Sequence, residues 1–238
     1  MPNNVMNEIQ FDCSEERFVE IAKFIKPDGN YPLGCVDFNK LIPMPEALDI
    51  ECGSRGDEGY AAYRTFVNDT CGMEYEAKSR VEEKYKAKFV NDPEIWELGK
   101  RYYENLRLYG AKTWYDWCWD HWDTKWNAYD CSEVETFSKY LLFNTAWSSV
   151  PSIVGALSRR YPDVTITYRW ADEDIGSNVG MFVIKNGVVL DEYIPDDGSA
   201  AAFELAAEVM DYDLAELGYT LSEDGSTYEW NEEDCVDW

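Results

Sequence analysis

One stretch, residues 164–194, constrains the fold of this chain more than any other. Its first part, VTITYRW, alternates between apolar and polar side chains, as expected for a half-buried β-strand. Its second part, VGMFVIKNGVVLDEYI, predicts two strands around Asn186–Gly187, a dipeptide that favours a two-residue hairpin. Because such a hairpin joins antiparallel strands, the chain is predicted to contain an antiparallel sheet. The side chains predicted to share one face of the first strand are Val164, Ile166, Tyr168 and Trp170.

Helical patterns occur on both sides of this stretch. Ser14 precedes EERFVEIAKFI, in which apolar residues recur at helical spacing. Pro151 can open a second helix that runs to Tyr161, and AAFELAAEVM predicts a third. Further short strands are predicted at residues 5–11, 35–43 and 141–147. These elements predict an α+β fold, in which helices pack on an antiparallel sheet.

The middle of the chain, residues 57–125, is predicted to be helical. Asp92 and Pro93 form an N-cap and first-turn pair, and Gly110 is suited to ending the same helix. The pattern changes again from residue 136. We therefore expect three parts: an N-terminal strand–helix–strand piece (1–56), a helical insert (57–127) and a C-terminal domain with an acidic tail (128–238).

The formal net charge of −26 is unevenly distributed along the chain. Residues 186–238 contain sixteen Asp and Glu and no Lys or Arg. A field of this sign repels nucleic acid and anionic membranes, so direct binding to either is not expected. The expected partners are cations, basic peptides and proteins that themselves bind nucleic acid. Solubility or an acidic host proteome is the simpler alternative explanation.

The stretch YGAKTWYDWCWDHWDTKWNAYD, residues 109–130, contains five tryptophans and the only histidine. On a helix, about two thirds of its surface would be aromatic and about one third acidic. This pattern predicts a helix packed in a core or between domains, and a platform for a basic protein or a cationic ligand is the functional alternative. His121 is interpreted as a packed residue, because no companion ligands stand at zinc-site spacing. We expect no metal and no cofactor.

The cysteines and the N-terminus predict the compartment. The seven cysteines are odd in number and none forms a C-x-x-C pair, which favours free thiols in a reducing environment. The N-terminal MPNNVMNEIQF lacks the basic and apolar regions of a signal peptide, and no stretch approaches eighteen apolar residues. We expect a cytoplasmic protein, and the sequence does not predict its oligomeric state.

Several longer motifs then stand together. They are MPNN at 1–4, DFNKLIPMPE at 37–46, YGAKTWYDWC from 109, FNTAWS at 143–148, and YPD, WADED and GSNVG between 161 and 180. Together they resemble the family of uncharacterised phage and plasmid proteins that have a YubB-type ferredoxin-like domain. The resemblance implies a ferredoxin-like antiparallel α/β sandwich at the C-terminal end, without an iron–sulfur cluster, and a place on mobile genetic elements. It implies no activity and no catalytic residue.

Two functions are compatible with these observations. The first is an acidic binding protein that inhibits a host defence nuclease or CRISPR effector by imitating a nucleic-acid backbone. The alternative is a Mg²⁺-dependent nuclease or nucleotide hydrolase that uses the carboxylates of Asp172, Glu173 and Asp174. We favour binding over catalysis, with the basic surface of a nucleic-acid-binding host protein as the partner. The residues predicted to contact it are Asp172, Glu173, Asp174, Asp196, Asp197, Glu232, Glu233 and Asp234.

Overall fold

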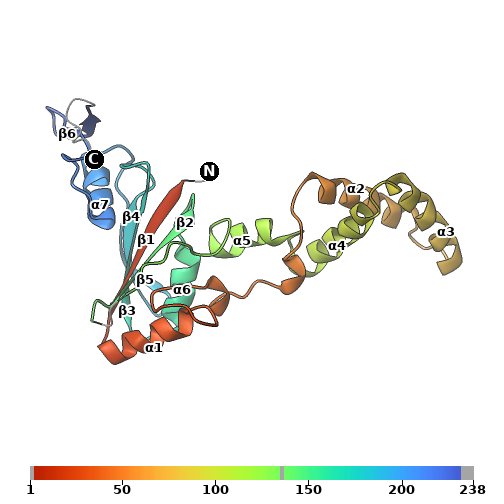
Figure 1. The fold of residues 1–238 in the computed structure, drawn as a ribbon, viewed down its shortest axis with the longest axis horizontal. Coiled ribbons are helices and arrows are strands. Elements are labelled where there is room, and N and C mark those ends of the chain that lie inside the picture. Colours follow the sequence, from red (N-terminus) through yellow and green to blue (C-terminus); the bar gives the residue numbers. More distant parts are fainter. Residues whose placement is uncertain (1–2, 135–136, 232–238) are drawn as a thin grey trace. The chain divides into compact units, whose positions relative to one another are not determined.

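We analysed a computed structural model that describes residues 3–134 and 137–231. The chain divides into two compact units (Figure 1). Unit 1 takes its described residues from Met1–Pro43 and His121–Trp238, and unit 2 is Met44–Asp120.

Unit 1 is built on a five-stranded antiparallel sheet with the strand order β2-β1-β3-β4-β5. The strands are β1 (Asn4–Asp12), β2 (Tyr140–Ala146), β3 (Thr165–Asp172), β4 (Gly180–Lys185) and β5 (Val188–Tyr193). Strand β1 pairs with β2 on one side and with β3 on the other, so the N-terminal and C-terminal parts of the chain form one sheet. The predicted α+β class, the antiparallel sheet and the hairpin around Asn186–Gly187 are confirmed.

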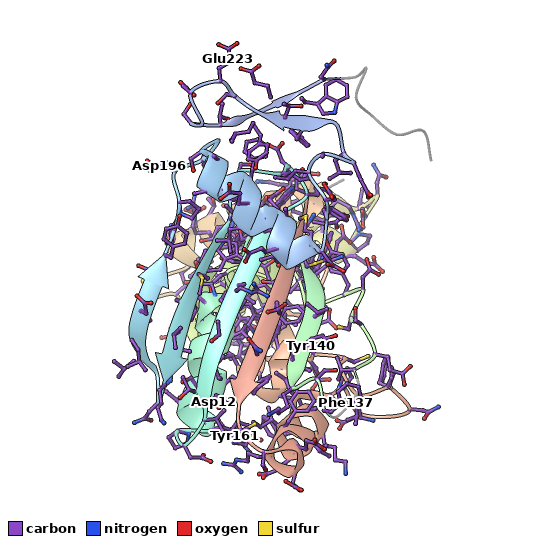
Figure 2. All side chains as sticks on the ribbon, turned by 90° about the vertical axis from the view of Figure 1, so that its left-hand side faces the viewer. Asp12, Phe137, Tyr140, Tyr161, Asp196 and Glu223 are labelled. Carbon is purple, nitrogen blue, oxygen red and sulfur yellow. The ribbon has the colours of Figure 1, made fainter. Side chains whose placement is uncertain are left out.

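Helices cover both faces of this sheet (Figures 1 and 2). The helices α1 (Glu15–Ile25) and α6 (Pro151–Arg160) lie on one face, where Phe18 of α1 contacts Phe11 of β1 with ring centroids 5.7 Å apart. The helix α7 (Ala200–Met210) lies on the other face, against Met6, Ala171 and Met181. Figure 2 shows that α7 crosses only part of its face, so the two layers of helices are unequal.

The core of the sheet confirms the alternating pattern. Val164, Ile166, Tyr168 and Trp170 are all buried, as predicted. At the centre, the buried Tyr168 hydroxyl donates to Asn7 Oδ1 and accepts from the Val150 backbone N–H at 2.8 Å, where α6 begins. Asn7 Nδ2 in turn donates to Thr145 Oγ1 at 2.8 Å. These bonds satisfy polar groups that burial would otherwise leave without partners.

The strand predicted at residues 35–43 is wrong. The segment contains a short 3₁₀ helix, Phe38–Lys40, because Asp37 Oδ1 accepts a hydrogen bond from the Asn39 backbone N–H and closes a tight turn. Asn127 Oδ1 takes the Phe38 backbone N–H that a neighbouring strand would have used. A second short 3₁₀ helix follows at Glu46–Leu48. The described part of the N-terminal piece, residues 3–56, is therefore strand–helix, without a second strand.

Unit 2 is helical, as predicted. Its main helices are α2 (Ser54–Asp69), α3 (Tyr75–Lys86) and α4 (Glu94–Tyr109), with a 3₁₀ turn at Ala87–Phe89. Helices α2 and α4 touch backbone to backbone, since a Cβ built on Gly99 would lie 2.0 Å from the Gly59 carbonyl carbon. Gly110 ends α4 in the left-handed conformation, as expected. The predicted capping role of Asp92 is wrong, because Pro93 holds the N-cap position and Asp92 binds Arg55 instead.

The tryptophan-rich stretch forms helix α5 (Trp114–Trp122), and the boundary between the two units falls within it, after Asp120. Trp117 and Cys118 are buried, and Cys118 Sγ lies 4.0 Å from Met44 Sδ within unit 2. Trp122 is buried in unit 1 beside Phe38. The interpretation of this stretch as a core helix agrees with this burial.

The acidic C-terminal part is folded as far as residue 231. A two-stranded hairpin, β6 (Tyr219–Leu221) and β7 (Tyr228–Trp230), turns at Gly225. The rings of Tyr219 and Tyr228 pack on Phe203 of α7. Within the described residues, the helices are all too short or too polar to cross a membrane.

Candidate functional site

The acidic residues predicted after β3 and β5 meet at one corner of unit 1. We call this group of Asp172, Glu173, Asp174, Asp196 and Asp197 the acidic corner. Asn178 connects its two loops. Its backbone N–H donates to Asp197 Oδ1 at 3.1 Å, and its Nδ2 donates to Asp172 Oδ2 at 3.0 Å. The structure thus brings together two acidic segments that are more than twenty residues apart in the sequence, whereas Glu232, Glu233 and Asp234 lie outside the described residues.

Asp172 is the buried member of the corner, with 5% of its surface exposed. Its Oδ1 accepts hydrogen bonds from Asn3 Nδ2 and from the Asp174 backbone N–H, both at 3.0 Å. Its Oδ2 accepts from Asn178. Three donors on a buried carboxylate are typical of a residue that organises a loop. Its predicted contact with a partner stays a prediction.

The other four carboxylates of the corner are exposed. Glu173 Oε2 accepts from Asn4 Nδ2 at 2.7 Å, and the Tyr129 hydroxyl donates to Asn4 Oδ1 at 2.6 Å. Burial raises the pKa of the Tyr129 phenol, and the charges of Asp130 and Glu173 raise it further, so this donor keeps its proton. Glu173 is therefore held in a defined position at the surface.

Two exposed tryptophans, Trp126 and Trp147, lie beside the corner. Trp147, which follows β2, has a left-handed backbone (φ 66°) and is 42% exposed. Its backbone N–H donates to Asn3 and its carbonyl accepts from Asn178, the same two residues that hold Asp172. A bulky residue in this conformation is strained, and such strain persists only where neighbours enforce it.

A cation already lies on this pair. Lys125 Nζ is 4.2 Å from the centre of the Trp126 ring and 4.9 Å from that of Trp147. Aromatic faces attract cations, so the geometry is suited to a lysine or arginine side chain. The sequence indicated a cationic ligand for the tryptophan stretch but missed Trp147, because nothing local shows that residues 126 and 147 lie beside the same lysine.

From the corner, exposed carboxylates extend over β5, α7, the segment between α7 and β6, and the β6–β7 hairpin. All twelve Asp and Glu between residues 186 and 231 are exposed, and no Lys or Arg occurs there. Among the described residues, the only ion pair that reaches one of them joins Glu208 to Arg169 at 3.5 Å. We call these twelve residues the acidic surface. They are Asp191, Glu192, Asp196, Asp197, Glu204, Glu208, Asp211, Asp213, Glu216, Glu223, Asp224 and Glu229.

Metal ligation has little geometric basis in the part of the chain that the structure describes. No group of three or more His, Cys, Asp or Glu there could hold a metal ion. Asp172, which the hydrolase alternative needs, uses both oxygens in hydrogen bonds to the protein. His121 is half-buried in α5, and its packed role is compatible with that position. The hydrolase alternative stays a prediction without a supporting observation.

Two hollows in the surface differ in size and in lining. A hollow of about 180 Å³ in unit 1 is lined by Asn4, Met6, Asn144, Glu173, Met210 and Tyr212. It is small against the pockets that hold drug-sized ligands, which start near 300 Å³. It borders the acidic corner through Glu173.

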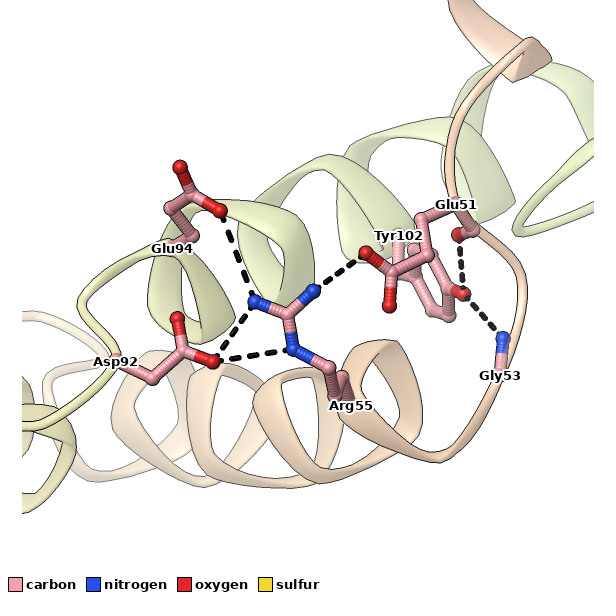
Figure 3. Close-up of polar contacts among 6 residues, drawn as sticks. All are labelled: Glu51, Gly53, Arg55, Asp92, Glu94 and Tyr102. Carbon is pink, nitrogen blue, oxygen red and sulfur yellow. Dashed lines mark hydrogen bonds and ion pairs between the residues drawn. The ribbon is translucent and has the colours of Figure 1, made fainter.

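The larger hollow, about 470 Å³, lies in unit 2 and contains Arg55 and Arg101. Figure 3 shows that Arg55 is surrounded by carboxylates, with Asp92 at 2.7 Å and Glu51 at 2.6 Å. The hydrogen bond to Asp92 raises the pKa of Arg55 above its ordinary value. Because its charge is already neutralised, Arg55 serves to fix the start of α2 against the start of α4.

One comparison with known proteins, the match to a family model, agrees with the fold. Residues 121–213 match the family model described as a ferredoxin-like domain in Api92-like protein. The C-terminal part of unit 1 is therefore a ferredoxin-like domain, as the resemblance implied. No curated protein matches the chain.

A solved structure, the protein Api92 from Yersinia pseudotuberculosis, is similar over 83% of this chain and 99% of its own length. The sequence identity is 11% and the TM-score is 0.42. Agreement of this size carries no conclusion about what the chain binds.

Proposed function

We propose that this protein binds the basic surface of a nucleic-acid-binding protein through its acidic surface. The observation that carries the proposal is the set of twelve exposed carboxylates on folded elements, without a Lys or Arg among residues 186–231. Charges that are already held in place bind a partner at a smaller entropic cost than charges on a flexible tail. Neither catalysis nor direct binding of nucleic acid is part of the proposal.

The class of partner follows from its charge. A groove that binds DNA or RNA is lined by Lys and Arg that neutralise phosphates. An exposed surface of carboxylates attracts such a groove over a screening length of about 8–10 Å at physiological salt. The protein would then occupy the groove and compete with the nucleic acid.

The biological setting comes from the resemblance of the sequence motifs to phage and plasmid proteins. A mobile element gains from blocking a host enzyme that destroys its DNA. CRISPR effectors hold their heteroduplex in a positively charged channel. We therefore propose a cytoplasmic host defence nuclease or CRISPR effector as the partner.

The first test captures the partner. The tagged full chain is immobilised, exposed to nuclease-treated host lysate and eluted with a salt gradient. The expected result is a DNA-binding or RNA-guided nuclease that elutes at moderate salt and whose binding of labelled DNA is inhibited by the protein. Capture of no basic protein would contradict the proposal.

Matched charge variants make the test specific to the acidic surface. One variant replaces four exposed glutamates of the acidic surface by Gln: Glu204, Glu216, Glu223 and Glu229. The control replaces four exposed glutamates of unit 2 by Gln: Glu58, Glu74, Glu76 and Glu104. Both change the net charge equally. We expect the first to weaken binding about tenfold or more and to flatten the salt dependence, and the control to have little effect. Equal losses would show that net charge alone, and not this surface, attracts the partner.

A further inference from the structure

The outer edge of the sheet, β5, has an unusual surface. All six of its residues are exposed, and Val188, Val189 and Leu190 are 59%, 49% and 60% exposed. In the described part of the chain, β5 pairs with β4 on one side and ends the sheet on the other. An edge strand presents unpaired backbone N–H and C=O groups. β5 therefore combines open hydrogen-bonding groups with exposed aliphatic side chains.

The backbone of β5 offers a donor at a known position. Asn186 and Gly187 both have positive φ, and Lys185 pairs with Val188 across this two-residue turn. The residues that flank such a turn exchange hydrogen bonds with each other, and the next residue on the strand points its N–H and C=O outwards. Val189 therefore directs its N–H away from β4.

Asp191 and Glu192 lie between the aliphatic residues Val188–Leu190 and Tyr193. Their side chains point to opposite faces of the sheet. Asp191 is paired with Val183, and Glu192 is paired with Phe182. Cross-strand neighbours share a face of the sheet, and Phe182 packs against Tyr168, whose hydroxyl accepts from Val150 at the start of α6. Glu192 therefore lies on the face covered by α1 and α6, and Asp191 lies on the opposite face.

This charge pattern distinguishes between two occupants of the edge. A second copy that paired antiparallel in a register centred on Asp191 or on Glu192 would place two like carboxylates directly opposite each other, and β5 contains no Lys or Arg that could neutralise them. Like charges across strands are destabilising. An extended segment with two adjacent basic residues would place one cation beside each carboxylate, because successive residues of a strand point to opposite faces.

We propose that β5 is a strand-addition site for an extended segment of a basic protein. The segment pairs with the backbone of β5, places two adjacent Lys or Arg beside Asp191 and Glu192, and packs aliphatic residues on Val188–Leu190. The inference rests on the proposed function for the charge of the partner. It adds the place of contact and the conformation of the bound segment.

The test uses a peptide instead of the unidentified partner. The probe is a fluorescent acetyl-TVVKKVVT-amide, titrated with the full chain at low ionic strength. We expect saturable binding, shifts of the backbone amide signals of residues 188–193 and slower hydrogen exchange at Val189. Replacing the two lysines of the peptide by glutamates should weaken binding about tenfold or more, and methylating alternate backbone nitrogens should abolish it. Binding that shifts signals elsewhere, or that survives backbone methylation, would overturn the proposal.

Variants of the chain separate backbone pairing from charge. Val189→Pro removes the outward N–H and should abolish binding of the peptide. The double variant Asp191→Lys and Glu192→Lys should lose the lysine peptide and gain the glutamate peptide, and it keeps the proposal testable should the proline variant not fold. The matched control is Glu223→Lys with Glu229→Lys on the β6–β7 hairpin, which should keep nearly full affinity.

Two results contradict the inference in distinguishable ways. A dimer in light scattering that Val189→Pro dissociates would identify a second copy as the occupant of β5. A captured basic protein that binds the β5 variants with unchanged affinity would leave the proposed function intact and exclude β5 as the contact. Peptide binding at β5 supports the strand-addition site even where no basic protein is captured.

Discussion

Replacing Asp172 by Ala should destabilise unit 1 by about 3 kcal/mol. The side chain is 5% exposed and accepts three hydrogen bonds, from Asn3, Asn178 and the Asp174 backbone, all at 3.0 Å. Each hydrogen bond contributes about 1 kcal/mol net, and more where the acceptor is charged. Alanine leaves three donors without this acceptor, and water reaches them poorly. The loss of one negative charge from a chain of net charge −26 offsets only a small part of this cost.

The isosteric variant Asp172→Asn should cost less, about 1–2 kcal/mol. The amide oxygen can keep the bonds from Asn3 and from the Asp174 backbone, but the amide nitrogen then faces the donor group of Asn178. Turning the Asn178 amide would restore that contact and would give up its bond to the Trp147 carbonyl. One hydrogen bond is lost in either arrangement.

The measurement is urea unfolding together with native-state hydrogen exchange of peptides from β3, which reports on unit 1 alone. Asp174→Ala is the matched control, because this carboxylate is exposed and, among the described residues, accepts only from Ser177, so a change within about 0.5 kcal/mol is expected. A cost below about 1 kcal/mol for Asp172→Ala, combined with full loss of partner binding, would refute the reasoning. Asp172 would then be a contact residue and not a support of the corner.

Three further outcomes are expected. Gly99→Ala should destabilise unit 2 by at least about 2 kcal/mol in thermal unfolding, because the new Cβ would meet backbone of α2. Its control is Gly155→Ala in α6 of unit 1, where the new Cβ meets the end of a flexible arginine side chain. This variant should stabilise unit 1 by about 0.5–1 kcal/mol. Tyr168→Phe should cost about 2–3 kcal/mol in urea unfolding, since it leaves two buried groups without their partner. Burial raises the pKa of Cys118 from 9.0 to about 12. The buried thiol therefore contributes fully to the free energy of unfolding below pH 9. Between pH 9 and 12 that free energy falls by about 1.4 kcal/mol per pH unit. Cys118→Ser should remove this slope from urea unfolding, and in alkylation at pH 7.5 the exposed Cys52 should react well before Cys118.

Local patterns predicted the regular elements well. The helix at Glu15–Ile25 begins after Ser14, whose hydroxyl accepts the Arg17 backbone N–H at 3.3 Å, as its position indicated. The hairpin around Asn186–Gly187 formed because both residues adopt positive φ readily. In these places the signal lies within a few residues and no distant contact opposes it.

The failures have a common cause in distant contacts. Residues 35–43 carry a strand-like pattern, but Asn127 takes the Phe38 N–H and the segment turns instead. Asp172 stands in the run WADED like its two acidic neighbours, and only Asn3 and Asn178 make it the buried one. The sequence placed β5 in a hairpin, but nothing local could indicate that both of its faces would be exposed.

The distribution of charge bears on whether the acidity has a function. The first 185 residues contain 21 Lys and Arg against 31 Asp and Glu, a net charge of −10, while the last 53 residues carry −16. A requirement for solubility, or adaptation to an acidic proteome, would act on both compact units alike. Here 16 of the 26 net negative charges lie in the last 53 residues, and the described part of this segment, 186–231, forms β5, α7 and the β6–β7 hairpin of unit 1. Concentrated like charge costs stability through self-repulsion. The same number of acids spread over the whole surface would cost less, so their concentration on neighbouring elements favours a role in binding a cationic partner.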